Sequence, residues 1–405
     1  MKLLVITPYP PFAPGGDGAT TRVYNQLKIL SRYMDLYIIV YVRKQFEENL
    51  EQIKDFNRHC AALEIITESD LPSSKKVQGV WNSITRKPRQ ITMCDAAKEA
   101  IKDRLKKWES RYVFDAVQIE HSFFGTLLKD FDATVRRVVV FMDVITDIAR
   151  HKYREARDIQ SKIDYWLKYH HIKLIEKEVL SYCDAAVVMS NGDKSSLQQI
   201  YGVDEVIISP NGVATESFDI PVKTDFDRAN ILFMGTFTYY PMREGMIYCI
   251  EELLPRLRAK LGKEAVQLTF VGPVYEGDRK NYESAQTIFT GRISNVAEYL
   301  NKASVCINPI KFGSGTCLKV LEYSASRKAT VSTLKGAEGL EMSNGVNIII
   351  AGRDHFDDEI VKLLQSPDKR RKIADGAFNF VSRNYTWGKT TEPLLKYYLP
   401  EVVFD

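Results

Sequence analysis

Short apolar segments alternate with longer polar or amphipathic segments along the first half of the chain. The first, 3–7, runs into a segment rich in proline and glycine, after which Val23, Leu27 and Leu30 recur at helical spacing. Further apolar runs rich in β-branched residues predict strands at 36–42, 116–119, 138–142 and 185–189. Strands that alternate with helices predict a parallel sheet covered by helices on both faces.

The alternation starts again near the middle of the chain. Pro210, Asn211 and Gly212 form a turn signal, and a polar segment then leads to a new apolar run. Strands are predicted here at 231–234, 267–271, 288–290, 305–309, 329–332 and 347–350. We therefore expect two doubly wound, Rossmann-like α/β domains, with ligands bound beyond the carboxyl ends of the strands.

These patterns predict a domain boundary within 205–228. The first domain is predicted at 1–205 and the second at 206–385, and 386–405 is expected to be a helix that packs back on the first domain. If the two domains face each other, the site lies in the cleft between them.

Composition narrows the class of protein. The 405 residues are 45% hydrophobic and 27% charged, a globular mixture, and the net charge of +4 does not favour a dedicated nucleic-acid-binding protein. The six cysteines form no CxxC pair and show no zinc-site spacing. The chain contains no apolar run of membrane-spanning length. The apolar stretch at its start is too short, and too interrupted by prolines, for a signal peptide. We expect a cytoplasmic protein.

A basic region at 75–108 includes an amphipathic helix predicted over 97–108. Two interpretations stay open. The charges can form a solvated helix face, or they can make a peripheral contact with the anionic inner surface of a membrane or with a lipid-phosphate acceptor.

The most informative segment is 312–339. A glycine-rich loop follows an apolar run and precedes a helix with Lys319 and Glu322, and its residues are Gly313, Ser314, Gly315 and Thr316. Glycines let backbone amides approach a ligand closely, and the first turn of a helix binds phosphate. Lys319 can neutralise a diphosphate, and Glu322, three residues later on the same helix face, can accept hydrogen bonds from both ribose hydroxyls.

This segment resembles the donor-binding motif of retaining GT-B glycosyltransferases of the large group 1 (family 4) type, in its GSGT-x-x-K-x-x-E form. Similar segments follow in the family's order at 233–246, 271–273, 289–310 and 384–389. The first half resembles the family more loosely, at its first 30 residues, at Glu120-His121 and near the boundary. The resemblance implies a GT-B fold of two Rossmann-like domains across a cleft.

The resemblance also assigns roles by position. Lys319 matches the diphosphate-binding lysine, Glu322 the carboxylate on the nucleotide ribose, and His121 a first-domain histidine near the transferred sugar, so Lys319 and His121 are the expected catalytic residues. The other donor-binding residues that it implies are Gly15, Gly16, Gly235, Thr236, Arg292, Gly313, Ser314, Gly315, Thr316 and Glu338. Family members transfer the sugar with retention and typically need no metal, so no metal ligand and no cofactor beyond the nucleotide sugar is expected.

Some positions depart from the family pattern. Ser314 stands eight residues before Glu322, where many relatives have a second glutamate, although the GSGT branch generally lacks it too. Cys317 replaces a common arginine, and Tyr323 replaces a common alanine. How the sugar is held is therefore left open.

Plainer interpretations stand beside several of these residues. His121 is equally compatible with a half-buried structural histidine, and Gly15 and Gly16 with a flexible loop. Two Asp-Phe-Asp sequences, at 130–132 and 225–227, imitate a metal-binding DxD motif, but solvated loop acids explain them better.

The sequence thus predicts a hexosyltransferase that uses a nucleotide-diphosphate sugar. The expected acceptor is a hydroxyl of a glycan, a lipid-linked intermediate or a small molecule, in glycan, glycolipid or polysaccharide biosynthesis, and no nucleic acid is an expected partner. Two alternatives are a nucleotide-sugar 2-epimerase of the same fold and a non-catalytic glycan-binding scaffold.

Overall fold

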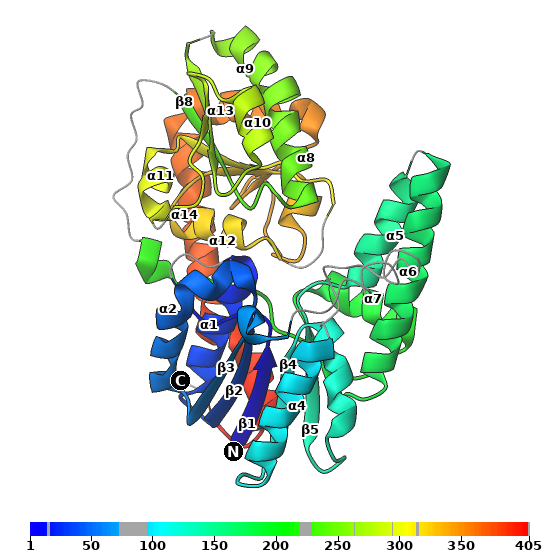
Figure 1. Cartoon of the computed structure of the whole chain (residues 1–405). Coiled ribbons are helices and arrows are strands. Elements are labelled where there is room, and N and C mark those ends of the chain that lie inside the picture. Colours follow the sequence, from blue (N-terminus) through cyan, green and yellow to red (C-terminus); the bar gives the residue numbers. More distant parts are fainter. Residues whose placement is uncertain are drawn as a thin grey trace. The chain divides into compact units, whose positions relative to one another are not determined.

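A computed structural model of the protein describes residues 1–13, 17–72, 95–156, 158–218, 229–262, 264–293, 295–312 and 316–403. The chain divides into two compact units, coloured along the sequence in Figure 1. The first unit combines Met1–Ser209 with Thr391–Asp405, and the second is Pro210–Thr390.

The first unit is built on a seven-stranded sheet in the order β3-β2-β1-β4-β5-β6-β7, in which every neighbouring pair is parallel. The strands are β1 (Lys2–Thr7), β2 (Asp35–Val42), β3 (Ala62–Thr67), β4 (Ala116–Glu120), β5 (Arg136–Phe141), β6 (Ala185–Val188) and β7 (Val206–Ile208). Since the chain starts at β1, moves outward to β3 and returns to β4, the strand order reverses between β1 and β4. This confirms the predicted doubly wound unit.

Both faces of this sheet are buried, which explains why residues 3–6 of β1 are all apolar. Leu4 and Ile6 point into one core, whereas Leu3 and Val5 point into the other, because successive strand residues face opposite ways. The first core lies under α4 (Asp95–Glu109), α7 (Asn191–Tyr201) and the 3-10 segment η4 (Ser122–Asp130). The second lies under α1 (Gly18–Leu30), α2 (Leu50–Asp55) and the end of α15 (Trp387–Tyr398).

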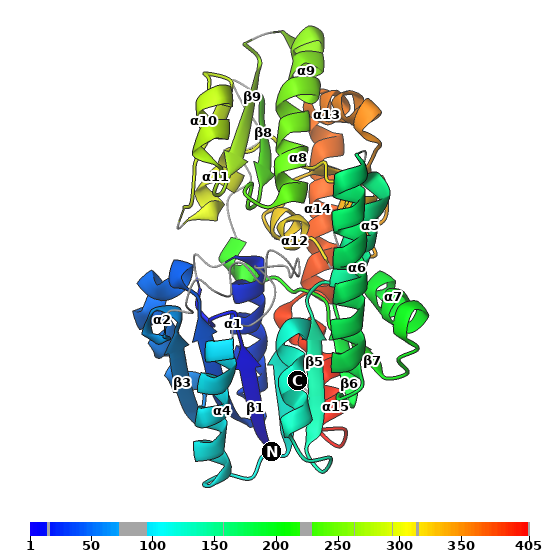
Figure 2. The same ribbon diagram turned by 45° about the vertical axis from the view of Figure 1, so that its right-hand side comes forward.

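Between β5 and β6 the chain forms a helical hairpin of α5 (Ile145–Glu155) and α6 (Ile159–Leu180), which Figures 1 and 2 show extending from the sheet of the first unit. The Glu176 carboxylate accepts hydrogen bonds from the Ile145 and Thr146 amides (3.1 and 3.4 Å), which satisfies donors at the start of α5. Phe123 of η4 packs between the helices in a small separate core, so the hairpin is anchored on the segment that follows β4.

The second unit is built on a six-stranded parallel sheet in the order β10-β9-β8-β11-β12-β13. Its strands are β8 (Ala229–Met234), β9 (Val266–Val271), β10 (Thr287–Phe289), β11 (Val305–Asn308), β12 (Thr330–Ser332) and β13 (Ile349–Ile350). Its helices are α8 (Tyr240–Tyr248), α9 (Leu254–Leu261), α10 (Glu276–Tyr282), α11 (Val296–Lys302), α12 (Leu318–Ala325), α13 (Phe356–Gln365) and α14 (Pro367–Asn384). Here the strand order reverses between β8 and β11.

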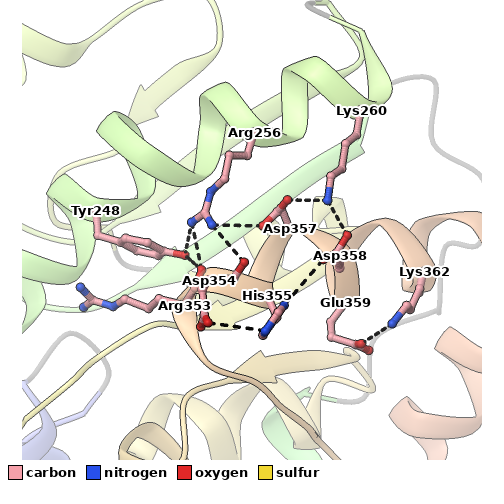
Figure 3. Close-up of polar contacts among 10 residues, drawn as sticks. All are labelled: Tyr248, Arg256, Lys260, Arg353, Asp354, His355, Asp357, Asp358, Glu359 and Lys362. Atoms are coloured by element: carbon pink, nitrogen blue, oxygen red, sulfur yellow. Dashed lines mark hydrogen bonds and ion pairs between the residues drawn. The ribbon is translucent and has the colours of Figure 1, made fainter.

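A buried arginine fixes the chain just after β11. Arg353 is 8% exposed, donates from Nε to the Pro309 carbonyl (2.6 Å) and forms an ion pair with Glu244. Its guanidinium lies over the Tyr248 ring, 4.4 Å from the centroid. Figure 3 shows how ion pairs around Lys260 extend this polar cluster between α9 and α13.

The structure differs from the sequence predictions at two strands. β3 and β7 were not predicted, because β3 is only half-buried and β7 has just three residues, so neither has a strong apolar signature. We predicted that the second domain starts at 206, but β7 pairs with β6 in the first sheet, and the second unit therefore starts at Pro210.

Candidate functional site

The candidate donor site of the second unit lies at the carboxyl ends of β8 and β11, where the strand order reverses and doubly wound sheets bind their ligands. Gly235 follows β8 directly, and the loop with Gly313, Ser314 and Gly315 follows β11; these three residues lie outside the described part of the chain. A Cβ atom at 235 would lie 2.9 Å from the Met242 sulfur and 3.5 Å from Cε of Lys319. The glycine therefore avoids a clash with Met242, and the Lys319 side chain lies within van der Waals reach of the end of β8.

Lys319 is the second residue of α12 and is half-buried. Its ammonium group forms no ion pair with any residue that the structure describes, and the first turn of α12 contains no acidic residue. An unpaired cation beside the amides of a helix N-terminus is suited to an anionic group such as phosphate.

Glu322 follows on the same face of α12 and is half-buried as well. Burial raises the pKa of Glu322 to about 7, and the nearby charge of Lys319 partly opposes this rise. Within the described residues its carboxylate makes no hydrogen bond. The two oxygens are therefore available to accept hydrogen bonds from ligand hydroxyls.

Two residues that the sequence analysis did not assign to the site hold this helix and its loop in place. The Tyr323 side chain is fully buried, and its hydroxyl oxygen accepts a hydrogen bond from the Met234 amide (2.7 Å) at the end of β8. Asn211 donates from its amide side chain to the Thr316 carbonyl (3.1 Å) and from its backbone to the Thr316 hydroxyl (3.3 Å). The departure of Tyr323 from the family pattern was the only sequence signal for the first contact.

The remaining predicted donor residues of this unit lie at the same edge of the sheet. Thr236 is exposed, and its carbonyl accepts a hydrogen bond from the Tyr239 amide before α8. Arg292 is exposed beyond the end of β10. Glu338 is exposed beyond the end of β12 and forms an ion pair with Lys335. Their roles in donor binding stay predictions.

In the first unit, His121 lies at the corresponding position, directly after β4 and at the reversal of strand order. Its ring lies 5.9 Å from that of Tyr9, which belongs to the segment after β1. Gly15 and Gly16 of the same segment lie outside the described residues. The φ angle of His121 is 104°, a conformation that non-glycine residues rarely adopt and that is common at functional sites.

The surroundings of His121 favour a neutral imidazole ring. Burial, together with the charge of Arg43, lowers the pKa of His121 to about 4, so the imidazole is neutral near pH 7. Nδ1 accepts a hydrogen bond from the Phe123 amide (3.2 Å), which places the ring proton on Nε2. The side chain therefore offers a neutral N–H donor.

Of the two Asp-Phe-Asp sequences, the structure describes only the one at 130–132. The Asp132 carboxylate accepts a hydrogen bond from the Thr134 amide (2.9 Å), and Asp130 forms an ion pair with Lys102 (3.0 Å). Asp132 lies in a loop and Asp130 is the last residue of η4, and both carboxylates are occupied by contacts within the first unit. The second sequence, 225–227, lies outside the described residues. Within the described ranges no cluster of His, Cys, Asp or Glu side chains is arranged to hold a metal ion, and no helix could cross a membrane.

Comparison with known proteins agrees with the sequence resemblance in the second unit. Residues 228–366 match the family model described as glycosyl transferases group 1. A 44.6 kDa protein from the cps region of Klebsiella pneumoniae, itself uncharacterized, is 22% identical over 98% of this chain and 99% of its own length. An uncharacterized glycosyltransferase of Methanocaldococcus jannaschii is 23% identical over 68% of this chain and 76% of its own length.

Several solved structures share the fold along nearly the whole chain. Sucrose-phosphate synthase from Thermosynechococcus elongatus has a TM-score of 0.68 at 15% identity, and 98% of each chain is covered. HepE from Anabaena, in complex with UDP-glucose, has a TM-score of 0.67 at 12% identity, covering 99% of this chain and 100% of HepE. WaaG, a glycosyltransferase involved in lipopolysaccharide biosynthesis, has a TM-score of 0.67 at 13% identity, covering 97% of this chain and 99% of WaaG. The expected GT-B fold is confirmed.

Proposed function

We propose that the protein is a glycosyltransferase that moves a sugar from a nucleotide-diphosphate donor to an acceptor hydroxyl with retention of configuration. The observation that carries this proposal is the pair on α12. Lys319 forms no ion pair with a described residue, and Glu322 has open acceptor oxygens. Both lie beyond the carboxyl ends of the paired strands β8 and β11, where the strand order reverses. The family match over this unit and the UDP-glucose bound to HepE support a nucleotide-sugar donor.

The proposed chemistry is largely electrostatic. The diphosphate leaving group gains negative charge as the glycosidic bond stretches, and the α12 amides with Lys319 stabilise that charge more in the transition state than in the ground state. The leaving phosphate oxygen takes the proton of the acceptor hydroxyl, which attacks from the same face of the sugar. No protein nucleophile and no metal enter this scheme.

His121 has a supporting role in this proposal. A neutral imidazole with its proton on Nε2 donates a hydrogen bond to a sugar hydroxyl without adding charge to the site. We further propose that the acceptor is a glycan or a lipid-linked intermediate of polysaccharide biosynthesis. The presence of a relative in a cps region supports this assignment.

A thermal-shift screen tests the donor site. UDP, GDP, ADP, dTDP and their sugar conjugates are compared with NAD and NADP, because a ligand that binds only the native state raises the melting temperature. We expect one nucleotide-diphosphate series to stabilise the protein. Lys319→Ala should reduce kcat/KM by tens-fold, because a charge-assisted contact contributes roughly 1.5–3 kcal/mol.

Lys302→Ala is the matched control, since Lys302 is exposed on α11 and pairs with Glu298. An unaltered response to nucleotides in Lys319→Ala would remove the phosphate assignment. Product formed without an acceptor would indicate a nucleotide-sugar 2-epimerase. No change of melting temperature with any nucleotide would indicate a non-catalytic glycan-binding scaffold. NMR of the product anomer decides between retention and inversion.

A further inference from the structure

Helix α6 is apolar on two opposite faces, and only one of them is buried. Ile172 and Val179 are 3% and 0% exposed and pack into the cores of the first unit. The other face carries a row that we call the α6 stripe: Ile159, Ile163, Trp166, Leu167 and Leu174, which are 80, 50, 45, 38 and 67% exposed. Steps of four, three, one and seven residues place these side chains along one side of the helix.

The α6 stripe is unusual on this surface. Elsewhere in the described residues exposed large apolar side chains stand singly, as Leu334 and Val346 do, or as two consecutive residues, as Tyr239 and Tyr240 do. Isolated exposed apolar residues are normal, whereas a contiguous row marks an interaction surface. The hairpin that carries the row extends from the sheet in both views (Figures 1 and 2).

Three lysines accompany the stripe. Lys162 lies one turn before Trp166, Lys177 lies one turn after Leu174, and Lys173 is close in helical angle to both lysines. None of the three forms an ion pair with a described residue. Many other surface lysines are paired with a carboxylate one turn away, as Lys302 is with Glu298 and Lys362 with Glu359.

We propose that the α6 stripe and these lysines dock the protein on an anionic lipid bilayer. A helix that exposes Trp, Ile and Leu beside unpaired lysines has the chemistry of the interface between acyl chains and anionic headgroups. A flat bilayer accepts a protruding row without a matching groove. In a symmetric contact between two copies, the antiparallel helices would bring like-charged lysines together.

The hairpin also connects the α6 stripe to His121 of the first unit. Phe123, two residues after His121, packs against Ala149 of α5 and Ile172 of α6. This point rests on the proposed transferase function. A bilayer bound at α6 would bring a lipid-linked acceptor to the helical hairpin that packs, through Phe123, against the segment containing His121. Helix α4, in the basic region considered earlier, offers no comparable row, because its apolar residues Ala97, Ile101, Leu105 and Trp108 are buried.

Vesicle sedimentation of the full-length protein, without donor or acceptor, tests the proposal. We expect binding to vesicles of phosphatidylcholine with phosphatidylglycerol and much weaker binding to phosphatidylcholine alone. Trp166→Gln/Leu167→Gln should lower the partition coefficient at least tenfold, because two apolar side chains lose their burial. Lys162→Gln/Lys177→Gln should lower it roughly fivefold for each lysine.

Two matched variants serve as controls. Leu334→Gln/Val346→Gln removes apolar side chains of the second unit that are more exposed than Trp166 and Leu167, and Lys106→Gln/Lys107→Gln removes exposed lysines of α4. Both should bind vesicles like the natural protein. Brominated lipids should quench the tryptophan fluorescence of the bound natural protein. Most of this quenching should be lost in Trp166→Phe, which keeps an apolar ring at this position.

Several results would overturn the proposal: no binding to anionic vesicles, equal binding by the α6 variants, or a loss confined to the α4 variant. Light scattering that shows a dimer dissociating in Trp166→Gln/Leu167→Gln, without vesicle binding, would assign the stripe to a second copy. Nucleotide-dependent thermal shifts of the same variants should be unchanged. Failure of the membrane proposal is thereby separated from failure of the transferase proposal.

Discussion

Glu322 shows at the scale of one residue how the surroundings set the chemistry of a side chain. Its position in the sequence motif identifies a carboxylate, but only its burial on α12 raises its pKa to about 7, with Lys319 opposing the rise. At physiological pH the group is therefore divided between a charged form and a neutral form. Only the charged form accepts hydrogen bonds through both oxygens.

Donor binding should consequently weaken as the pH falls from 8 to 6. The ionised fraction of Glu322 drops from about nine tenths to about one tenth over this range, so the Kd of the nucleotide sugar should rise up to roughly tenfold. Calorimetric titration with a nucleotide-diphosphate sugar measures this, because its diphosphate keeps a constant charge over the range. Glu322→Gln should bind more weakly at pH 8 and show little pH dependence.

The comparison variant is Glu338→Gln, which removes an exposed carboxylate paired with Lys335. It should keep the pH dependence of the natural protein. A pH dependence that persists unaltered in Glu322→Gln would mean that another group controls binding.

At the scale of elements, the end of β11 is held by a contact that is distant in sequence. Arg353, 44 residues after Pro309, donates to the carbonyl of that residue and forms an ion pair with Glu244 of α8. Three separate elements thus determine where the glycine-rich loop begins. The buried guanidinium would leave Glu244 without its partner if it were removed.

Arg353→Met should therefore lower the free energy of unfolding by about 3 kcal/mol, near the lower end for a broken buried ion pair because Glu244 is partly exposed. Chemical denaturation measures the change. Arg371→Met is the control, since its ion pair with Asp368 lies at an exposed position of α14 and should contribute at most about 0.5 kcal/mol. Equal effects of the two variants would contradict the structural role of Arg353.

At the scale of the whole molecule, the chain completes the first unit with its last residues. Leu394, Leu395 and Tyr398 of α15 are buried in the core under the first sheet, and the Tyr398 hydroxyl donates to Gln118 of β4 (2.9 Å). The 181 residues of the second unit, 210–390, separate these side chains from the rest of that core in the sequence. Stability of the first unit therefore depends on a segment that follows the second unit in the sequence.

Leu394→Ala should destabilise the first unit by about 3 kcal/mol, the loss expected for a cavity at a fully buried leucine. Hydrogen exchange should increase in peptides from β1 and β5 and stay unchanged in β8 and β11. Leu334→Ala, at a position 75% exposed, should have no such effect. Faster exchange confined to the second unit would contradict this assignment of α15.

The sequence by itself determined the parts of this protein that depend on local pattern. Continuous apolar runs are characteristic of buried parallel strands, so most strands of both sheets were predicted, with ends close to those observed. The helix with Lys319 and Glu322 was predicted because a glycine-rich loop and a three-residue spacing are local features. Weak strands such as β3 and β7 were missed for the same reason, since pairing with neighbours, more than their own sequence, defines them.

Only the tertiary structure decided which distant residues meet. It brought Tyr323 to the Met234 amide, Asn211 to Thr316 and Arg353 to Pro309, contacts between residues 44 to 105 positions apart. It also decided which apolar side of α6 is covered, which the sequence of a helix apolar on two faces does not show. Burial and side-chain pairing arise from the packing of separate elements. The local sequence pattern around a residue does not show which distant residue it will contact.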